Sequence, residues 1–252
     1  CVVKTVDDCK YIEKLIKIKN INFIFAQFSY ATWRNLKVER ESMALNKIKR
    51  LDIILNYFNP DFLFPFASFI YFSHKENQFM NDSINTPRDI YYSQLLKKFR
   101  KKIIFLKPLD IIDIEKIDYK ILENLNHNSI NYWDDKYKLI QNNNINTGKK
   151  FYDFESLKKT FYEYNKIIKE NFFLLPNFLE KIKFIEPIII FVKDLNKNIK
   201  ISYLGEFSVS DESYDIECSS EALFSILRYE YGWDGIKISG RFKSNKTNGY
   251  NK

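Results

Sequence analysis

Histidine and cysteine are scarce in this 252-residue chain. Its two histidines are His74 and His127, and its three cysteines are Cys1, Cys9 and Cys218. Two isolated histidines cannot form the paired-histidine motifs of zinc enzymes, and three scattered cysteines give neither a disulfide framework nor a zinc-binding cysteine pair. The chain alone therefore has no complete histidine metal site. The low cysteine content fits a reducing, cytoplasmic location.

Glycine is absent from the first 147 residues, because all six glycines lie at or after Gly148. Glycine-rich phosphate loops of dinucleotide-binding and P-loop proteins are thus excluded from this part. Long apolar runs are also missing. The richest stretch, residues 62–72, is far shorter than the roughly 20 residues of a membrane-spanning helix. We expect a soluble globular protein without a transmembrane segment.

Positive charge is in excess, with 40 Lys and Arg against 32 Asp and Glu, for a net charge of +8. Such a balance can indicate nucleic-acid or anionic-membrane binding. However, the lysines are spread along the chain, and only residues 96–102 form a concentrated run. Charge runs at helix ends normally face water. Because no recognition motif accompanies the charge, the sequence predicts no specific nucleic-acid partner.

The chain opens with Cys-Val-Val-Lys-Thr, without an initiator Met or an apolar signal core. We therefore expect an upstream part to be missing.

Strand and helix patterns alternate over residues 1–107, which favours an α/β domain. The expected elements are strands at 2–6, 21–26, 62–72 (interrupted at Pro65) and 103–106, and helices at 10–18, 39–57 and from Thr86 through Phe99. Thr86, Pro87 and Asp89 form a strong helix start.

Residues 108–150 are weakly patterned and end in a polar run at 141–148, so we expect an irregular connection or linker there. Residues 151–252 predict a small, mostly antiparallel α+β domain. Its expected elements are helices at 153–173, after Pro176 and at 220–229, strands at 188–192, 199–203 and 214–218, a turn at 232–235 and a last strand at 236–242.

Three blocks carry a resemblance to a known family: residues 25–33 (FAQFSYATW), 65–77 (PFASFIYFSHKEN) and 80–82 (MND). They resemble the C-terminal half of metallo-β-lactamase-fold hydrolase-like proteins, in the class related to the CMP-N-acetylneuraminate hydroxylases. The resemblance implies the C-terminal half of a four-layer αββα fold. It also implies zinc or iron in the intact protein, held mostly by a histidine-rich loop of the N-terminal half, which this chain lacks.

The function implied by the resemblance is metal-dependent hydrolysis of a small, sugar-derived substrate, in surface-sugar or nucleotide-sugar metabolism. A Rieske-linked hydroxylase of a nucleotide-activated amino sugar is the alternative within the same class. Residues 214–242 are similar to the end of sterol-carrier-protein-like domains, which enclose an apolar cavity. A non-catalytic module that holds an apolar ligand therefore stays open, as does a tail that only packs on the main domain.

Candidate site residues cluster in the resembling blocks. Gln27, Ser29, Tyr30 and Trp33 follow a buried strand, where ligands of α/β layers bind, and Asn77 lies in a second polar cluster. We predict that these five residues contact substrate; the alternatives are aromatic caps on the core and turn chemistry at Asn77. His74 is the one candidate metal ligand, with a surface histidine outside any metal site as its alternative. No catalytic residue is assigned.

Overall fold

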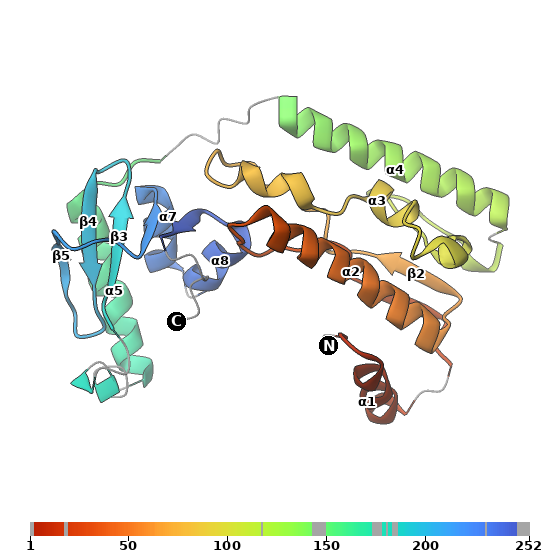
Figure 1. The fold of residues 1–252 in the computed structure, drawn as a ribbon, viewed down its shortest axis with the longest axis horizontal. Helices are drawn as coiled ribbons and strands as arrows, with labels where there is room; N and C mark the ends of the chain where they lie inside the picture. Colours follow the sequence, from red (N-terminus) through yellow and green to blue (C-terminus); the bar gives the residue numbers. More distant parts are fainter. Residues whose placement is uncertain are drawn as a thin grey trace. The chain divides into compact units, whose positions relative to one another are not determined.

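A computed structural model describes residues 3–17, 20–116, 118–142, 150–172, 178–179, 181–182, 186–229 and 231–245. The chain is a mixed α/β protein that divides into two compact units (Figure 1). The first unit contains Cys1–Ala31, Leu36–Ser73 and Met80–Ile145; the second contains Thr32–Asn35, His74–Phe79 and Asn146–Lys252. Two short segments from the first half of the chain, 32–35 and 74–79, thus belong to the second unit. The four-layer metallo-β-lactamase architecture stays a prediction.

The sheet of the first unit is small and parallel. Strands β1 (Phe23–Ala26) and β2 (Phe62–Pro65) pair in parallel, and an isolated parallel bridge joins Leu63 to Ile103. Both strands expected here are present, but the burial expected for the first is wrong: the residues of β1 are exposed or half-buried, whereas most of β2 is buried. The expected continuation to residue 72 is wrong: the strand ends at Pro65, and Ala67 adopts a positive φ of 52°, which breaks an extended backbone. At 103–106 the structure has only the bridge at Ile103.

Two helices flank these strands in sequence. α1 (Val6–Ile16) starts with a capping box between Thr5 and Asp8, so the expected strand over residues 2–6 is wrong in its described part. α2 (Lys37–Phe58) agrees with the predicted helix and ends at Asn59, whose φ of 44° is left-handed. Pro60 follows and prevents continuation of the helix.

The predicted start of the next helix is confirmed, but its length is wrong. α3 (Pro87–Tyr91) has the capping box of Thr86 and Asp89, yet it ends after five residues. The chain then forms the 3-10 helix η2 (Lys97–Lys102). Ile90, Leu96 and Phe99 are all buried. A continuous α-helix would place Leu96 about 120° away from the face of Ile90, at 100° per residue, so the chain must break to bury all three.

Residues 108–150, expected as an irregular connection, contain the short 3-10 helix η3 (Ile114–Lys116) and the 24-residue helix α4 (Tyr119–Asn142). Its buried face consists of Leu122, Asn126, Ser129 and Ile130. Two of these four residues are polar, which explains the weak apolar pattern in the sequence. Most of the polar run at 141–148 lies outside the described residues.

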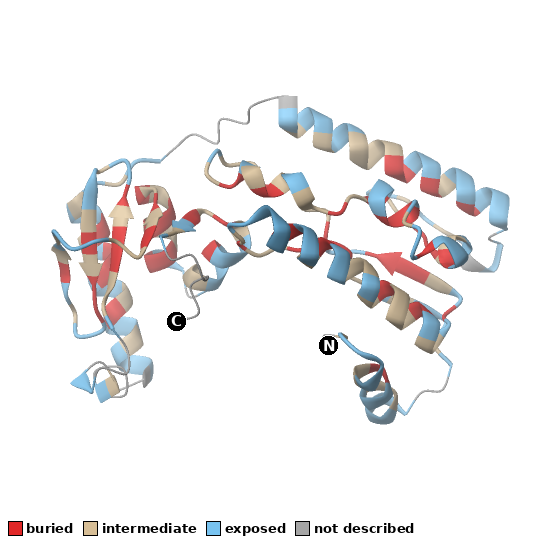
Figure 2. Cartoon of the chain, in the orientation of Figure 1, coloured by how far each residue is buried: buried red, intermediate tan, exposed pale blue. Residues whose placement is uncertain are grey.

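A large apolar cluster in the core of the first unit is formed by helices and strands far apart in sequence, and a smaller one consists of Phe64, Ile104 and Leu122 (Figure 2). The large cluster consists of Phe28, Leu51, Leu55, Leu63, Ile90, Tyr91, Leu96, Phe99, Ile103, Phe105 and Ile130. Two buried asparagines satisfy backbone groups beside it. Asn126 accepts from the Phe105 amide (2.7 Å) and donates to the Ile103 carbonyl (2.8 Å), while Asn85 Nδ2 donates to the carbonyls of Phe28 and Ala44.

The second unit contains a five-stranded mixed sheet. Its strands are β3 (Ile188–Val192), β4 (Lys197–Ile201), β5 (Phe207–Val209), β6 (Ile216–Cys218) and β7 (Phe242–Ser244), in the order β5-β4-β3-β6-β7. Only β3 and β6 pair in parallel. Helix α5 (Phe154–Phe172) precedes the sheet, and α7 (Ser220–Arg228) and α8 (Gly232–Ser239) connect β6 to β7. The structure confirms the predicted strand at 188–192 and the predicted helices at 153–173 and 220–229. The sequence did not predict β5.

The predicted strand at 236–242 is wrong, because α8 occupies residues 232–239. Gly232 permits a close approach of the two helices: a Cβ there would lie 2.1 Å from the Ile226 carbonyl oxygen of α7. Gly240, with φ of 65°, then ends α8 before the short strand β7. The helix expected after Pro176 falls largely outside the described residues. Among the residues that are described, no helix combines the length and apolarity needed to cross a membrane.

Replacing Asn126 with Ala should destabilise the protein by about 3 kcal/mol, because it leaves the Phe105 amide and the Ile103 carbonyl buried without partners. Urea unfolding measures this loss. Asn124→Ala, on the exposed side of the same helix, is the matched control and should change stability by less than about 0.5 kcal/mol. Equal effects of both substitutions would contradict the role given to Asn126.

Candidate functional site

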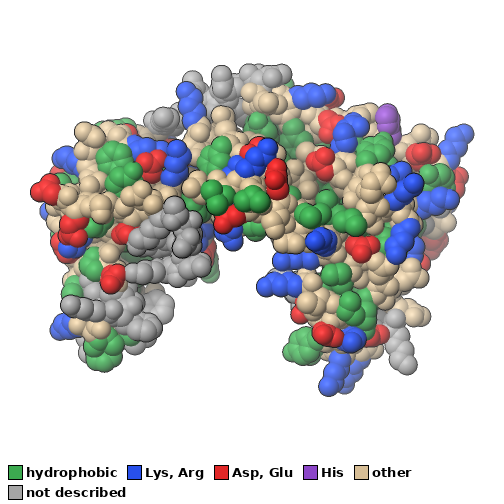
Figure 3. All heavy atoms as spheres, viewed as in Figure 1, with side chains coloured by type: hydrophobic (Ala, Val, Ile, Leu, Met, Phe, Trp, Pro, Cys, Tyr) green, Lys and Arg blue, Asp and Glu red, His purple; other side chains and the backbone are tan. Residues whose placement is uncertain are grey.

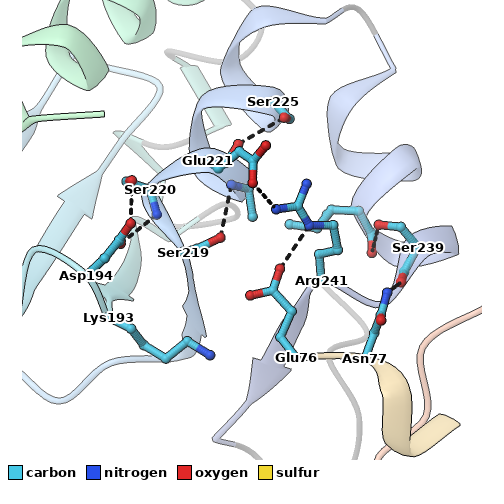
Figure 4. Close-up of polar contacts among 12 residues, drawn as sticks. Glu76, Asn77, Lys193, Asp194, Ser219, Ser220, Glu221, Ser225, Ser239 and Arg241 are labelled. Carbon is cyan, nitrogen blue, oxygen red and sulfur yellow. Dashed lines mark hydrogen bonds and ion pairs between the residues drawn. The ribbon is translucent and has the colours of Figure 1, made fainter. Parts of the chain in front are cut away.

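Three of the predicted site residues lie in the second unit, in segments 32–35 and 74–79. Both segments pack against the corner between α8 and β7. The Trp33 amide donates to the Lys237 carbonyl (2.7 Å), and the indole stacks on Phe242 with ring centroids 4.8 Å apart. Asn77 Nδ2 donates to the Ser239 carbonyl (2.6 Å; Figure 4). Trp33 and Asn77, 44 positions apart in the chain, therefore reach the same corner.

A tight turn presents Asn77. The amides of Asn77 and Gln78 both donate to the His74 carbonyl, each at 2.9 Å, and Gln78 begins the 3-10 helix η1 (Gln78–Ser83). This turn brings Glu76 and Asn77 side by side toward the corner, as Figure 4 shows.

Arg241 connects this turn to α7 and β7. Its Nε lies 2.9 Å from a Glu76 carboxylate oxygen, and its Nη2 lies 2.8 Å from a Glu221 carboxylate oxygen (Figure 4). The three side chains are only 14–21% exposed. Charge-assisted hydrogen bonds in so little solvent are strong and directional, and the loss of one partner leaves a charge poorly solvated. We refer to Glu76, Glu221 and Arg241 as the Arg241 clamp.

The first turn of α7 is fixed to the β3–β4 turn by a second polar contact. Asp194 accepts from the Ser220 amide (2.7 Å) and from the Ser220 hydroxyl (2.5 Å). The Tyr152 amide donates in turn to the same hydroxyl (3.1 Å), and Ser219 caps the helix by accepting from the Ala222 amide. Ser220 is fully buried, so its hydroxyl has a structural role here.

The surroundings of His74 do not fit a zinc or iron site. Burial and the nearby Arg241 cation lower the pKa of His74, while Glu76 and Glu221 oppose that shift. Glu76, which could have been a second ligand, is already paired with Arg241. Within the described ranges, no three His, Cys, Asp or Glu side chains come together as a metal ion would require. No step of chemistry is therefore assigned to a metal at His74, whose role as a ligand stays a prediction.

Two buried polar atoms at the corner have no hydrogen-bond partner among the described residues: Trp33 Nε1 and Asn77 Oδ1. Trp33 is 6% exposed and Asn77 is 2% exposed. Buried polar atoms in proteins are almost always paired, and an unpaired one costs about 1–3 kcal/mol. The two atoms are one donor and one acceptor, both on segments that contact the same corner.

The other predicted contacts lie in the first unit, where each has a partner. Gln27 is exposed and accepts from Lys47 Nζ (3.0 Å). Ser29 is buried and accepts from the Asn85 amide (3.0 Å), and Tyr30 is buried and donates to the Met80 carbonyl (2.7 Å). Burial raises the pKa of Tyr30. The structure thus separates the predicted loop, with Gln27, Ser29 and Tyr30 in one unit and Trp33 in the other.

Sequence reasoning missed the Arg241 clamp. The residues Gly240, Arg241 and Phe242 were noticed only as the end of an expected strand. The carboxylates that pair with Arg241 come from positions 165 and 20 residues away in the chain. No local spacing could have identified them.

Comparisons with known proteins add no relative: no protein-family model, no curated protein and no solved structure matches this chain.

Replacing Arg241 with Met should cost about 2–3 kcal/mol of unfolding free energy, because it leaves the Glu76 and Glu221 carboxylates unpaired in a mostly buried place. Arg228→Met is the control, since Arg228 pairs with Glu163 at 3.4 Å where both side chains are more than half exposed. That substitution should change stability by less than about 0.5 kcal/mol. Similar losses in both variants would show that the clamp adds nothing beyond an exposed ion pair.

The stability of the second unit should fall as the pH drops below about 6.5, partly through His74. Because the folded state lowers the pKa of His74 from 6.5, the unfolded chain binds this proton more readily, and protonation favours unfolding. His74→Asn should therefore lose less unfolding free energy than the wild type between pH 7.5 and pH 5.5. His127→Asn, at an exposed position of α4, is the control. Identical pH profiles for His74→Asn and the wild type would overturn this assignment.

Proposed function

We propose that this chain is a ligand-binding module, and that Trp33 and Asn77 of the second unit bind a small molecule. The observation that carries the proposal is the pair of buried, unpartnered atoms, Trp33 Nε1 and Asn77 Oδ1. The sequence had already placed both residues among the substrate contacts. A ligand that supplies an acceptor and a donor would remove the cost of leaving the two atoms unpaired.

The chemistry of the two atoms specifies the ligand group. Trp33 Nε1 only donates and Asn77 Oδ1 only accepts, and a hydroxyl or a secondary amide has both the acceptor and the donor that these atoms need. Hydroxyls and amides occur on sugar-derived molecules, and a hydroxyl also forms the polar head of sterol-like molecules. A sugar-derived ligand agrees with the resemblance of residues 25–33 and 65–77 to hydrolase-like proteins. A sterol-like ligand agrees with the resemblance of residues 214–242 to sterol-carrier-protein-like domains. The shared feature is a neutral polar group that both donates and accepts.

The Arg241 clamp positions this site. Glu76 precedes Asn77 directly, so the ion pair to Arg241 fixes the turn that carries the Asn77 amide. Phe242 follows Arg241 directly and forms the platform on which Trp33 stacks. We infer that Arg241 is a positioning residue, because its cation is already engaged by two carboxylates.

Trp33→Phe tests the proposal, because it keeps an aromatic ring on Phe242 and removes the N–H together with the rest of the five-membered ring. The unfolding free energy should fall only by the cost of the smaller buried ring, about 1–2 kcal/mol, since no existing hydrogen bond is lost. Trp133→Phe is the matched control for the same change of ring. Trp133 Nε1 donates to the Leu106 carbonyl (2.9 Å), so this substitution should cost about 1 kcal/mol more.

Binding is measured with two probes, N-acetylglucosamine by saturation-transfer NMR and the fluorescent sterol dehydroergosterol by its emission. One probe should bind the wild type, and Trp33→Phe should weaken its binding by about three- to tenfold, the effect of one hydrogen bond. Trp133→Phe should bind as the wild type does. Failure of both probes, or equal binding by Trp33→Phe, would reject the site.

The metal-dependent hydrolase implied by the resemblance is a second proposal. It is supported by the parallel pairing of β1 and β2, with Gln27 directly after β1, where α/β proteins bind ligands. The fold and the zinc or iron of that class rest on the resemblance alone, as does the Rieske-linked hydroxylase of an amino sugar. Metal analysis of the protein after metal-supplemented expression tests both the hydrolase and the hydroxylase proposals. Stoichiometric zinc or iron would favour them, and the absence of both metals would reject them.

A further inference from the structure

The 3-10 helix η2 carries an unusual concentration of positive charge. Residues 90–109 contain six Lys and Arg and no Asp or Glu. Five of these cations lie in η2: Lys97, Lys98, Arg100, Lys101 and Lys102. None of the five forms an ion pair with a carboxylate of the described residues. We refer to these five residues as the η2 basic surface. Figure 3 shows Lys and Arg side chains exposed in this part of the first unit, around α3.

Aromatic rings lie among these cations. The Arg100 guanidinium is 5.6 Å from the centre of the Tyr91 ring and 5.5 Å from that of Tyr92. Lys101 Nζ is 4.5 Å from the centre of the Tyr119 ring. Tyr92 is 47% exposed and Tyr119 is 45% exposed, so both rings are available to a partner. One acidic side chain, Glu123, is near enough to Tyr91 to act on its pKa.

From this arrangement we propose that the η2 basic surface binds single-stranded nucleic acid without sequence specificity. Cations that follow a phosphate backbone, together with exposed rings on which bases stack, are the two components of such binding. In this proposal Lys97, Lys98 and Lys101 contact phosphates, and Tyr92 and Tyr119 contact bases. Lys102 already donates to Asn59 Oδ1 and to the Pro60 carbonyl, each at 2.7 Å. The site is separate from Trp33 and Asn77 and does not depend on the function proposed for them.

An anionic membrane is the less favourable partner, because the apolar residues of this segment are not available. Tyr91, Leu96, Phe99 and Ile103 are all part of the core cluster of the first unit. Insertion into a membrane surface needs an apolar face in addition to the charge. The large apolar or aromatic side chains of residues 90–109 that are exposed are Tyr92, Leu95 and Leu109, and the exposed Tyr119 ring lies beside Lys101.

The test uses the full chain and a fluorescein-labelled 20-nucleotide oligo-dT, followed by anisotropy between 50 and 200 mM salt. The wild type should bind, with an affinity that falls steeply with salt. The triple substitution Lys97→Gln, Lys98→Gln and Lys101→Gln should weaken binding at least about tenfold. It should also reduce the slope of log affinity against log salt by about 2, the value for three phosphate contacts on a single strand. Tyr92→Leu should weaken binding about fivefold or more through lost stacking.

Lys159→Gln, Lys166→Gln and Lys169→Gln, at exposed positions of α5, form the control, because they change the net charge by the same amount. The control should bind nearly as the wild type does. Lys98 donates to Asn56 Oδ1, so the double variant Lys97→Gln and Lys101→Gln repeats the test without removing that bond.

Three results would overturn the proposal. One is the absence of oligo-dT binding at 50 mM salt, and another is an equal loss in the α5 control, which would mean that only net charge matters. The third is a preference for vesicles of phosphatidylcholine with 30% phosphatidylglycerol over the oligonucleotide, which would assign the surface to a membrane.

Discussion

The two ion pairs of Arg241 are the constraint on which the second unit depends. Arg241 lies at the start of β7 and binds Glu76 in the 74–79 turn and Glu221 in the first turn of α7. Three segments that are distant in sequence meet at this guanidinium. A planar group with five donors can hold two carboxylates at once, whereas lysine would act only as a point charge. Asn77 directly follows Glu76, and Trp33 stacks on Phe242, which directly follows Arg241, so both residues reach the α8–β7 corner beside these ion pairs.

This arrangement places polar side chains where their hydrogen bonds are incomplete. Elsewhere in the chain, buried polar groups such as Asn85 and Asn126 have well-placed partners. Trp33 and Asn77 each keep one buried atom unpaired among the described residues, as do Tyr137 and Asn165. Proteins tolerate such atoms mainly where a ligand or an ordered water completes them. Trp33 and Asn77 supply a donor and an acceptor on two segments that pack against one corner, which is the reason for assigning that corner to binding.

Local chemistry made much of the fold predictable from the sequence. The Thr86–Asp89 capping box, the Asn59–Pro60 helix end and the apolar strand 188–192 each depend on neighbouring residues, and each is present in the structure. α4 could not be found by apolar periodicity, because Asn126 and Ser129 occupy its buried face. α8 was mistaken for a strand, because Gly232 serves the packing of α7 rather than a turn. The site was only half predictable: its residues were named, but their separation into two units and the role of Arg241 depend on long-range contacts.

Hydrogen exchange in Arg241→Met tests the central claim most directly. The Trp33 amide is bonded to the Lys237 carbonyl of α8, so its exchange reports whether segment 32–35 stays docked on the corner. The Asn77 and Gln78 amides are bonded to the His74 carbonyl, so their exchange reports whether the turn held by Glu76 stays formed. We predict that these amides lose protection in the variant, while the amide of Phe28, bonded to Ser68 in the first unit, keeps it. Unchanged protection of residues 33, 77 and 78 would contradict the account.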